Sequence, residues 1–143
     1  MAVFGNNNTS AGNFGNNNDV ITGNRYPLSE DADAVASITV RFQILSGLAS
    51  SWKVKCAIYD SSFNLIDSTD ERTITYTADG GFDVWETFNF SSPPALSAGD
   101  YWLVVWADYI SGGSPRFRRL DTGGTSLTSG ISYGAWPDPL VPT

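Results

Sequence analysis

The side chains that most often carry out catalysis are scarce in this sequence. There is no histidine, the commonest general base and metal ligand, and the fifteen acidic residues are scattered mainly over predicted turns. Glu86 with Asp83 or Asp108 would make a carboxylate pair suited to glycoside hydrolysis. No nucleophilic-serine motif, phosphate-binding glycine loop or paired-cysteine metal spacing is present. The sequence therefore indicates a protein that is not an enzyme and has no catalytic residues.

A short acidic cluster is the best candidate for metal binding. Glu30, Asp31 and Asp33 lie together in "SEDAD", and hard oxygen ligands in a loop beside a sheet edge suit Ca²⁺. Their spacing does not match the ligand pattern of a known calcium loop, and a solvated turn is the favoured explanation of the cluster. We expect no cofactor, with structural Ca²⁺ at these three residues as the open alternative.

Aromatic residues offer a different chemistry, the stacking of rings on sugars. An exposed tryptophan packs on the C–H face of a sugar, while nearby polar groups hydrogen-bond its hydroxyls. Trp102 and Trp106 share one face of a strand whose other face is also apolar, so they either lie under a loop, arm or partner or form a platform. Packing in the core competes with this glycan interpretation. The candidate glycan-binding residues are Trp85, Trp102, Trp106, Tyr109, Arg116 and Arg118.

The N-terminal leader carries the word FGNNN twice, at residues 4–8 and 14–18. Its Gly, Asn and Ser content suits a flexible linker, but a linker has no reason to place a phenylalanine at the same point of each copy. As an assembly arm, residues 1–18 would seat their phenylalanines in apolar hollows while their asparagines hydrogen-bond to strand edges. The residues of this arm are Phe4, Asn6, Asn7, Asn8, Phe14, Asn16, Asn17 and Asn18.

Residues 19–143 alternate apolar and polar side chains with the period of a β-strand and show almost no helical periodicity. The segments 38–44 and 52–58 each place apolar residues on one face only, and the single cysteine, Cys56, falls on such a face. The segment 101–106 is apolar on both faces, so it must be a central strand. These features predict an all-β domain: a two-sheet antiparallel β-sandwich, jelly-roll-like, with about eight or nine strands and an extended N-terminal arm.

The stretch "LSAGDYWLVV", residues 96–105, resembles the tyrosine corner of immunoglobulin-like and fibronectin-type sandwiches. The resemblance implies structural roles for Leu96, Gly99 and Tyr101, with the Tyr101 phenol hydrogen-bonded to the backbone. The longer segments "KVKCAIYDSSFNLIDSTDE", "WETFNFSSPPALSAGDYWLVVWAD" and "YGAWPDPL" together resemble choice-of-anchor-like, jelly-roll-like sandwich modules that recur in uncharacterised surface-anchored and phage-associated proteins. That resemblance implies exposure on a virion or extracellular surface and no catalysis.

One departure from this family bears on the arm. Such modules usually continue past the "PDPL" segment into a further strand, whereas this sequence stops at Thr143. We therefore expect the arm to cover the edge or core slot of that strand, in its own domain or in a neighbouring subunit. No signal peptide is visible at the N-terminus, which fits a virion protein assembled inside a cell.

Charge narrows the choice of partners. The net charge of −7 disfavours nucleic acid and anionic lipid, and no apolar run is long enough for membrane insertion. The favoured hypothesis is a non-catalytic structural or attachment module, of the decoration or fibre type, in a virion or extracellular surface assembly. Its expected partners are further copies, as a homo-oligomer, or neighbouring virion or surface subunits. The alternative is a carbohydrate-binding module that uses outward-facing tryptophans.

Overall fold

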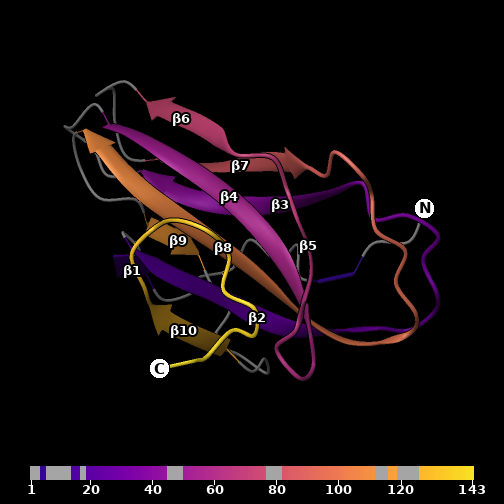
Figure 1. Cartoon of the computed structure of the whole chain (residues 1–143). Helices are drawn as coiled ribbons and strands as arrows, with labels where there is room; N and C mark the ends of the chain where they lie inside the picture. Colours follow the sequence, from indigo (N-terminus) through magenta and orange to yellow (C-terminus); the bar gives the residue numbers. More distant parts are fainter. Residues whose placement is uncertain are drawn as a thin grey trace.

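Two antiparallel sheets face each other in the computed structural model, which describes residues 4–5, 14–16, 19–44, 50–76, 82–111, 116–118 and 126–143 (Figure 1). All secondary structure in these ranges is strand, so the predicted all-β sandwich is confirmed. The described part of the chain holds ten strands: β1 (Phe14–Asn16), β2 (Val20–Leu28), β3 (Ser37–Ile44), β4 (Ser50–Asp60), β5 (Leu65–Ser68), β6 (Arg72–Tyr76), β7 (Phe82–Asn89), β8 (Gly99–Ser111), β9 (Arg116–Arg118) and β10 (Ser126–Gly130).

The strands are connected in a jelly-roll-like way. One sheet has the order β1-β9-β3-β7, and the other has the order β10-β2-β8-β4-β5, with β6 also paired to β4. Along the chain the partners are nested, since β2 pairs with β8, β3 with β7, and β4 with β6. Successive members β2, β3 and β4 alternate between the sheets, as do β6, β7 and β8. This nesting is the pattern expected for a chain folded double and rolled into two sheets.

The core between the sheets follows from period-two alternation. In β4, Trp52, Val54, Cys56 and Ile58 are all at most 2 % exposed and pack in one cluster. Phe42 of β3 and Phe88 of β7 meet them from the four-stranded sheet, with their ring centroids 6.3 Å apart. Burial in this apolar cluster raises the pKa of the Cys56 thiol well above its ordinary value.

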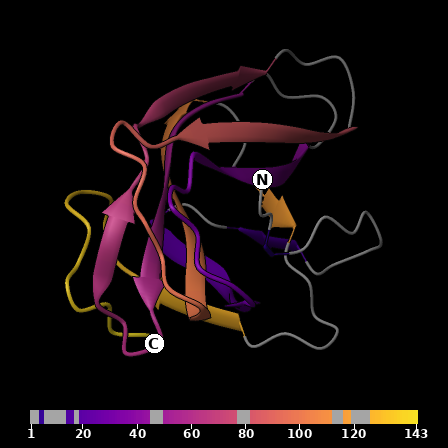
Figure 2. The same ribbon diagram turned by 90° about the vertical axis from the view of Figure 1, so that its right-hand side faces the viewer.

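A second apolar layer lies on the outside of the six-stranded sheet. Because β8 is apolar on both faces, Trp102, Val104 and Trp106 point away from the inter-sheet core and form a separate buried cluster. Residues 131–143, here called the C-terminal strap, cover this cluster, and Leu140 of the strap is only 2 % exposed. Figure 2 shows the strap, in yellow, on the side of the sheet that faces away from β3 and β7. The molecule thus has three layers.

A tyrosine corner closes the crossover into β8. The Tyr101 hydroxyl donates a hydrogen bond of 2.7 Å to the carbonyl of Ser97, four residues earlier. Leu96 is buried and forms an isolated bridge with Ala32, while Gly99 begins β8 opposite Leu28. The three residues that the resemblance marks as structural therefore lie at one end of the sandwich.

Replacing Tyr101 with Phe should lower the free energy of unfolding by about 1 kcal/mol, because one phenol-to-carbonyl hydrogen bond is lost. Urea titration of both proteins measures the change. Ser97→Ala is the matched control, since the acceptor is a backbone carbonyl that this substitution keeps. Equal losses in the two variants would show that the hydrogen bond does not stabilise the corner.

Candidate functional site

The six candidate glycan-binding residues do not share one face. Trp85 lies in β7 and Arg116 and Arg118 lie in β9, all in the four-stranded sheet. Trp102, Trp106 and Tyr109 lie in β8, in the other sheet. Period-two alternation assigns residues to faces within a strand, but it does not assign strands to sheets, so the sequence grouped residues that the topology separates.

Trp102 and Trp106 do not form an open platform, because the C-terminal strap covers them. Their exposed fractions are 4 % and 0 %. Phe63 stacks on Trp102 at 5.4 Å between ring centroids, and Tyr133 and Trp136 of the strap each lie 5.1 Å from Trp106. Of the alternatives that the sequence left open, the structure contains the covered arrangement. A sugar cannot stack on either ring while the strap is in place.

The strap is held at one end by an aromatic box around a lysine. The Lys55 ammonium lies 4.8 Å from the ring centroid of Trp106, 4.5 Å from that of Tyr133 and 5.2 Å from that of Trp136. Lys55 pairs with Trp106 across β4 and β8, which aims both side chains at the strap. The ammonium also donates a hydrogen bond to the carbonyl of Gly134. A cation over three ring faces is attracted by each ring quadrupole.

The carboxylate of Glu71, at the edge of the aromatic box, offsets the positive charge of Lys55. The Tyr133 hydroxyl donates a 2.7 Å hydrogen bond to the carboxylate of Glu71. Burial lowers the pKa of Lys55, whereas the negative charge of Glu71 acts to raise it. Burial together with this hydrogen bond raises the pKa of Tyr133 far above its ordinary value of 10.0. The neutral phenol is therefore the form that the folded chain favours.

Further along the strap, separate hydrogen bonds replace a strand ladder. The Tyr59 hydroxyl donates to the carbonyl of Pro137 at 2.7 Å, and the Leu140 amide donates to the carbonyl of Phe63 at 2.9 Å. Near the end of the strap, the Thr143 amide donates to the carbonyl of Thr128 at 2.8 Å, which covers the outer edge of β10. These contacts tie the strap to both margins of the six-stranded sheet.

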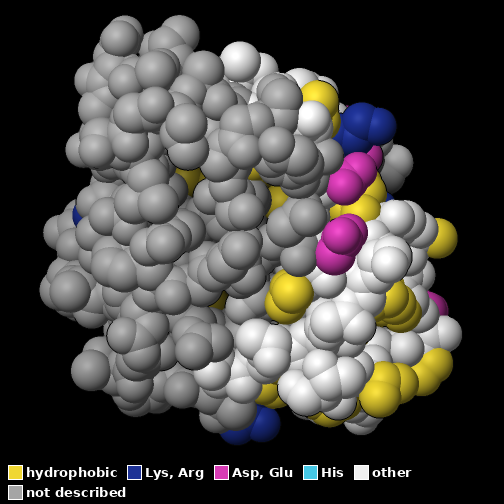
Figure 3. Space-filling model, turned by 90° about the vertical axis from the view of Figure 1, so that its left-hand side faces the viewer, with side chains coloured by type: hydrophobic (Ala, Val, Ile, Leu, Met, Phe, Trp, Pro, Cys, Tyr) yellow, Lys and Arg dark blue, Asp and Glu magenta, His cyan; other side chains and the backbone are white. Residues whose placement is uncertain are grey.

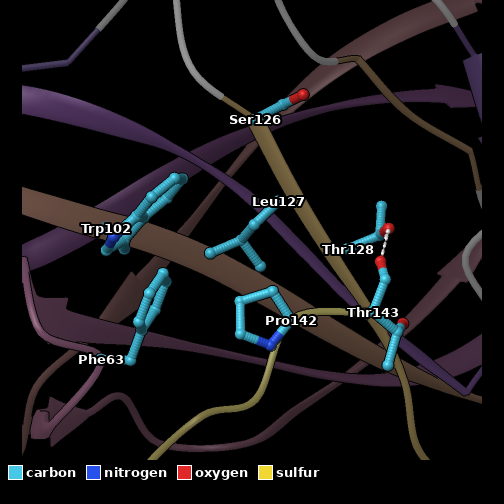
Figure 4. A pocket seen from close by; sticks show the side chains of 7 residues that line it. All are labelled: Phe63, Trp102, Ser126, Leu127, Thr128, Pro142 and Thr143. Carbon is cyan, nitrogen blue, oxygen red and sulfur yellow. Dashed lines mark hydrogen bonds between the residues drawn. The ribbon is translucent and has the colours of Figure 1, made fainter.

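A shallow hollow of about 350 Å³ lies where the strap meets β10. Figure 4 shows Trp102 and Phe63 on one side of this hollow and Thr128 and Thr143 on the other. The Arg25 guanidinium lies 5.9 Å from the ring centroid of Trp102. The side chains that line the hollow are themselves uncharged: Phe63, Trp102, Ser126, Leu127, Thr128, Pro142 and Thr143. Such a lining suits neutral, partly apolar groups.

Trp85 is the candidate tryptophan that is open to solvent. It is 43 % exposed on β7, and the Arg41 guanidinium lies 6.0 Å from its ring centroid. Beside this pair, the exposed hydroxyls of Thr39 and Thr87 lie 3.0 Å apart across β3 and β7. In the same sheet, Arg116 of β9 is the backbone partner of Gln43. The outer face of the four-stranded sheet thus combines an accessible ring with polar groups.

The described parts of the N-terminal arm lie against the sandwich. Phe14, Gly15 and Asn16 form β1, paired antiparallel with β9. The Phe4 ring meets Tyr101 edge to face at 6.3 Å and packs on the margin of the inter-sheet core. The other asparagines assigned to the arm lie outside the described residues: Asn6, Asn7, Asn8, Asn17 and Asn18.

The arm and the strap cover other parts of the domain than expected, since the sequence predicted that the arm would cover the C-terminal end of the sandwich. The arm adds to the edge at β9, while the strap covers the edge of β10 and the outer apolar cluster. The C-terminal region therefore covers its own part of the sandwich, and the arm is not needed there. The prolines of the strap rule out a regular strand, so the strand pattern in the sequence does not predict that this segment packs on the sheet.

The acidic candidates have structural contacts. The Asp31 carboxylate accepts a 2.7 Å hydrogen bond from the Ala98 amide, which links two turns. Among the described residues, no group of three acidic, cysteine or histidine side chains is placed to hold a metal ion. The Glu86 carboxylate forms an ion pair of 3.0 Å with Arg72 and accepts a hydrogen bond from Tyr76. On the face in Figure 3, the described charged side chains are scattered rather than gathered into one patch.

The comparisons with known proteins add no relative. No family model, no curated protein and no solved structure matches this chain. The resemblance to choice-of-anchor-like modules therefore stays a prediction. Within the described residues, no helix is long and apolar enough to cross a membrane.

Sequence reasoning missed Lys55, Tyr133 and Trp136, which together make the densest set of ring contacts in the described structure. The period-two alternation of the segment 52–58 places Lys55 on its outward face, which is correct for the direction of the side chain but omits the layer above it. The available signal was the pair of aromatic residues in a proline-flanked segment. Aromatic residues there favour packing on a sheet over free solvation.

Alkaline pH should destabilise the fold through its buried tyrosines. The pKa values of Tyr59, Tyr76 and Tyr133 are all raised from 10.0, chiefly by burial. Above about pH 10 the unfolded chain releases phenol protons that the folded chain retains, so this stabilisation is present below pH 10 and is lost as the pH rises further. We expect the urea midpoint to fall over that range, and the share of the tyrosinate absorbance that comes from these three residues to appear only on unfolding.

The control for this experiment is Tyr133→Phe, which removes one of the three groups and should flatten the decline. Phenols that ionise near pH 10 in the folded protein, with an unchanged urea midpoint, would contradict the assignment.

Proposed function

We propose that this chain is a non-catalytic structural or attachment module of a virion or extracellular surface assembly, and that its copies associate through the N-terminal arm. The observation that carries the proposal is the pairing of β1 with β9. The arm engages the sheet by main-chain pairing, as an added strand does, and not as a tether between domains.

The position of β1 at the end of its sheet supports association. β1 is the first strand in the order β1-β9-β3-β7, so one of its edges faces away from β9. An edge strand presents unpaired amides and carbonyls that can pair with another chain. A second copy that brings its own β1 to this edge would extend the sheet across a twofold axis.

The edges of β7 and β10 are partly occupied by the chain itself. Arg72 donates a 2.7 Å hydrogen bond to the carbonyl of Thr87 on β7, and the Asp70 amide donates to the carbonyl of Asn89 at 2.9 Å. The Thr143 amide does the same for Thr128 on β10. Covered edges of this kind limit indiscriminate pairing, which favours β1 as the site of a specific contact.

Carbohydrate binding is the second candidate function, and the exposure of Trp85 favours it. A half-exposed ring with a guanidinium and two hydroxyls beside it offers both stacking and hydrogen bonding to a sugar. The two functions are compatible, since a surface module can assemble through one sheet edge and bind a glycan on a sheet face.

The association proposal predicts that the chain of residues 1–143 sediments as an oligomer and that deletion of residues 1–18 gives a monomer. The variant Phe4→Ser with Phe14→Ser keeps the length and the asparagines of the arm, and we expect it to weaken association at least tenfold. Sedimentation velocity over a range of concentrations measures both. A chain of residues 1–143 that is monomeric, or a serine variant that associates as the original does, would contradict the proposal.

The carbohydrate candidate predicts that immobilised polysaccharides retain the chain and that Trp85→Ala reduces retention at least fivefold, because the stacking ring is removed. Thermal melting should be almost unchanged, since Trp85 is exposed. Ile66→Ala is the matched control, an exposed large apolar residue of the other sheet. Failure of a broad polysaccharide panel to retain the original chain would exclude this function.

A further inference from the structure

We infer that the outer face of the six-stranded sheet is a receptor for the C-terminal strap, and that a second copy of this chain can supply the strap. This is a second route of association between copies. It uses different contacts from the N-terminal arm, which pairs with β9 of the other sheet and packs Phe4 on Tyr101 at the inner side of β8.

The strap binds as a peptide ligand binds, and not as a strand of the sheet. Pro137, Pro139 and Pro142 lack amide hydrogens, so a continuous ladder cannot form along it. Extended proline-rich segments instead dock on aromatic surfaces, with isolated hydrogen bonds to their free carbonyls. The Tyr59 hydroxyl bonded to the Pro137 carbonyl, beside the stacked rings of Phe63 and Trp102, matches this mode.

Anchors at both ends of the strap give it a defined position. At one end, Trp136 packs 6.3 Å from Tyr59 and 5.1 Å from Trp106, over the Lys55 ammonium. At the other end, Leu140 is 2 % exposed and its amide is hydrogen-bonded to the carbonyl of Phe63. Two apolar anchors with polar contacts between them are the usual requirement for specific recognition of a short segment.

The contact is less complete than the core between the sheets. The indole nitrogens of Trp102 and Trp136 are buried and have no hydrogen-bond partner among the residues that the structure describes. The hollow beside Trp102 leaves further space at the margin of the same layer (Figure 4). Unpaired buried donors weaken an interface, so this layer is expected to open before the two sheets separate.

Release of the strap leaves a surface that must be covered again. The exposed cluster would contain Tyr59, Trp102 and Trp106, three large aromatic side chains in one apolar cluster. The strap contacts from Tyr133 to Thr143 could be re-formed by the strap of another copy. The amide of Ile131 donates to the carbonyl of Asp19, and its carbonyl accepts from the Trp106 indole. These two hydrogen bonds would be given up, since the connection at Gly130 and Ile131 would change course. Both of these residues are exposed. Exchange of an identical terminal element between copies needs no new contact surface.

Complementation between two variants of the chain of residues 1–143 tests the inference. Leu140→Asp disables the strap but keeps the receptor face, whereas Lys55→Glu disables the receptor face but keeps the strap. If straps exchange, the mixture forms a one-to-one heterodimer in which the intact strap docks on the intact face, while neither variant forms it alone. Both variants should also carry Phe4→Ser and Phe14→Ser. These substitutions weaken association through the arm, so a heterodimer that still forms must come from exchange of the strap. Lys53→Glu replaces Lys55→Glu in the control mixture, because Lys53 is an exposed residue of the same strand.

A labelled peptide of residues 131–143 provides a second measurement that does not depend on the variants folding. A protease site placed between Gly130 and Ile131 of the full chain allows the strap to be cut after folding. With a tenfold excess of peptide, we expect most cut chains to carry label after gel filtration, and a peptide of scrambled order to give no label. Retention of the original fragment without uptake of label, or its loss without replacement, would overturn the inference, as would a heterodimer that forms equally with the Lys53→Glu control.

Discussion

The architecture depends on one constraint, the apolar character of both faces of β8. A strand of this kind at the centre of a sheet must be covered on both faces, because several large apolar side chains would otherwise be exposed to water. The four-stranded sheet covers the face that carries Val105, and the C-terminal strap covers the face that carries Trp102 and Trp106. Since the strap cannot pair as a strand, the aromatic box around Lys55 takes over the task of holding it.

Much of the fold could be predicted from local patterns. Alternation assigned the inward residues of β4, and the doubly apolar segment identified β8 as central, because both inferences depend on side chains within one strand. The phenol-to-carbonyl bond of Tyr101 follows the local sequence in the same way. The candidate glycan face could not be predicted, because Trp85 and Trp102 reach different sheets through pairings that are remote in sequence. The role of Lys55 depends on a segment 79 residues away, which no local pattern connects to it.

The two ends of the chain perform similar tasks on opposite sheets. The arm reaches the end of the four-stranded sheet through β1, and the strap reaches the outer face of the six-stranded sheet. Each contact is made by a segment close to a terminus of the described chain, although Phe4 of the arm also packs on the margin of the core between the sheets. Segments in such positions can detach and rebind at a modest cost in stability, because they form few of the core contacts. The central sandwich is therefore a rigid carrier, and the association chemistry that we propose lies at its margins.

The burial of Cys56 at the centre of the sandwich has a practical consequence. The thiol is fully enclosed between the sheets and is the one sulfhydryl of the sequence. Alkylating reagents can reach it only when β4 separates from the opposite sheet, and movement of either terminal segment leaves it shielded. Its rate of labelling thus reports how often the inner layer opens, without any added probe. The rate of Cys56 alkylation in the native chain therefore measures global unfolding.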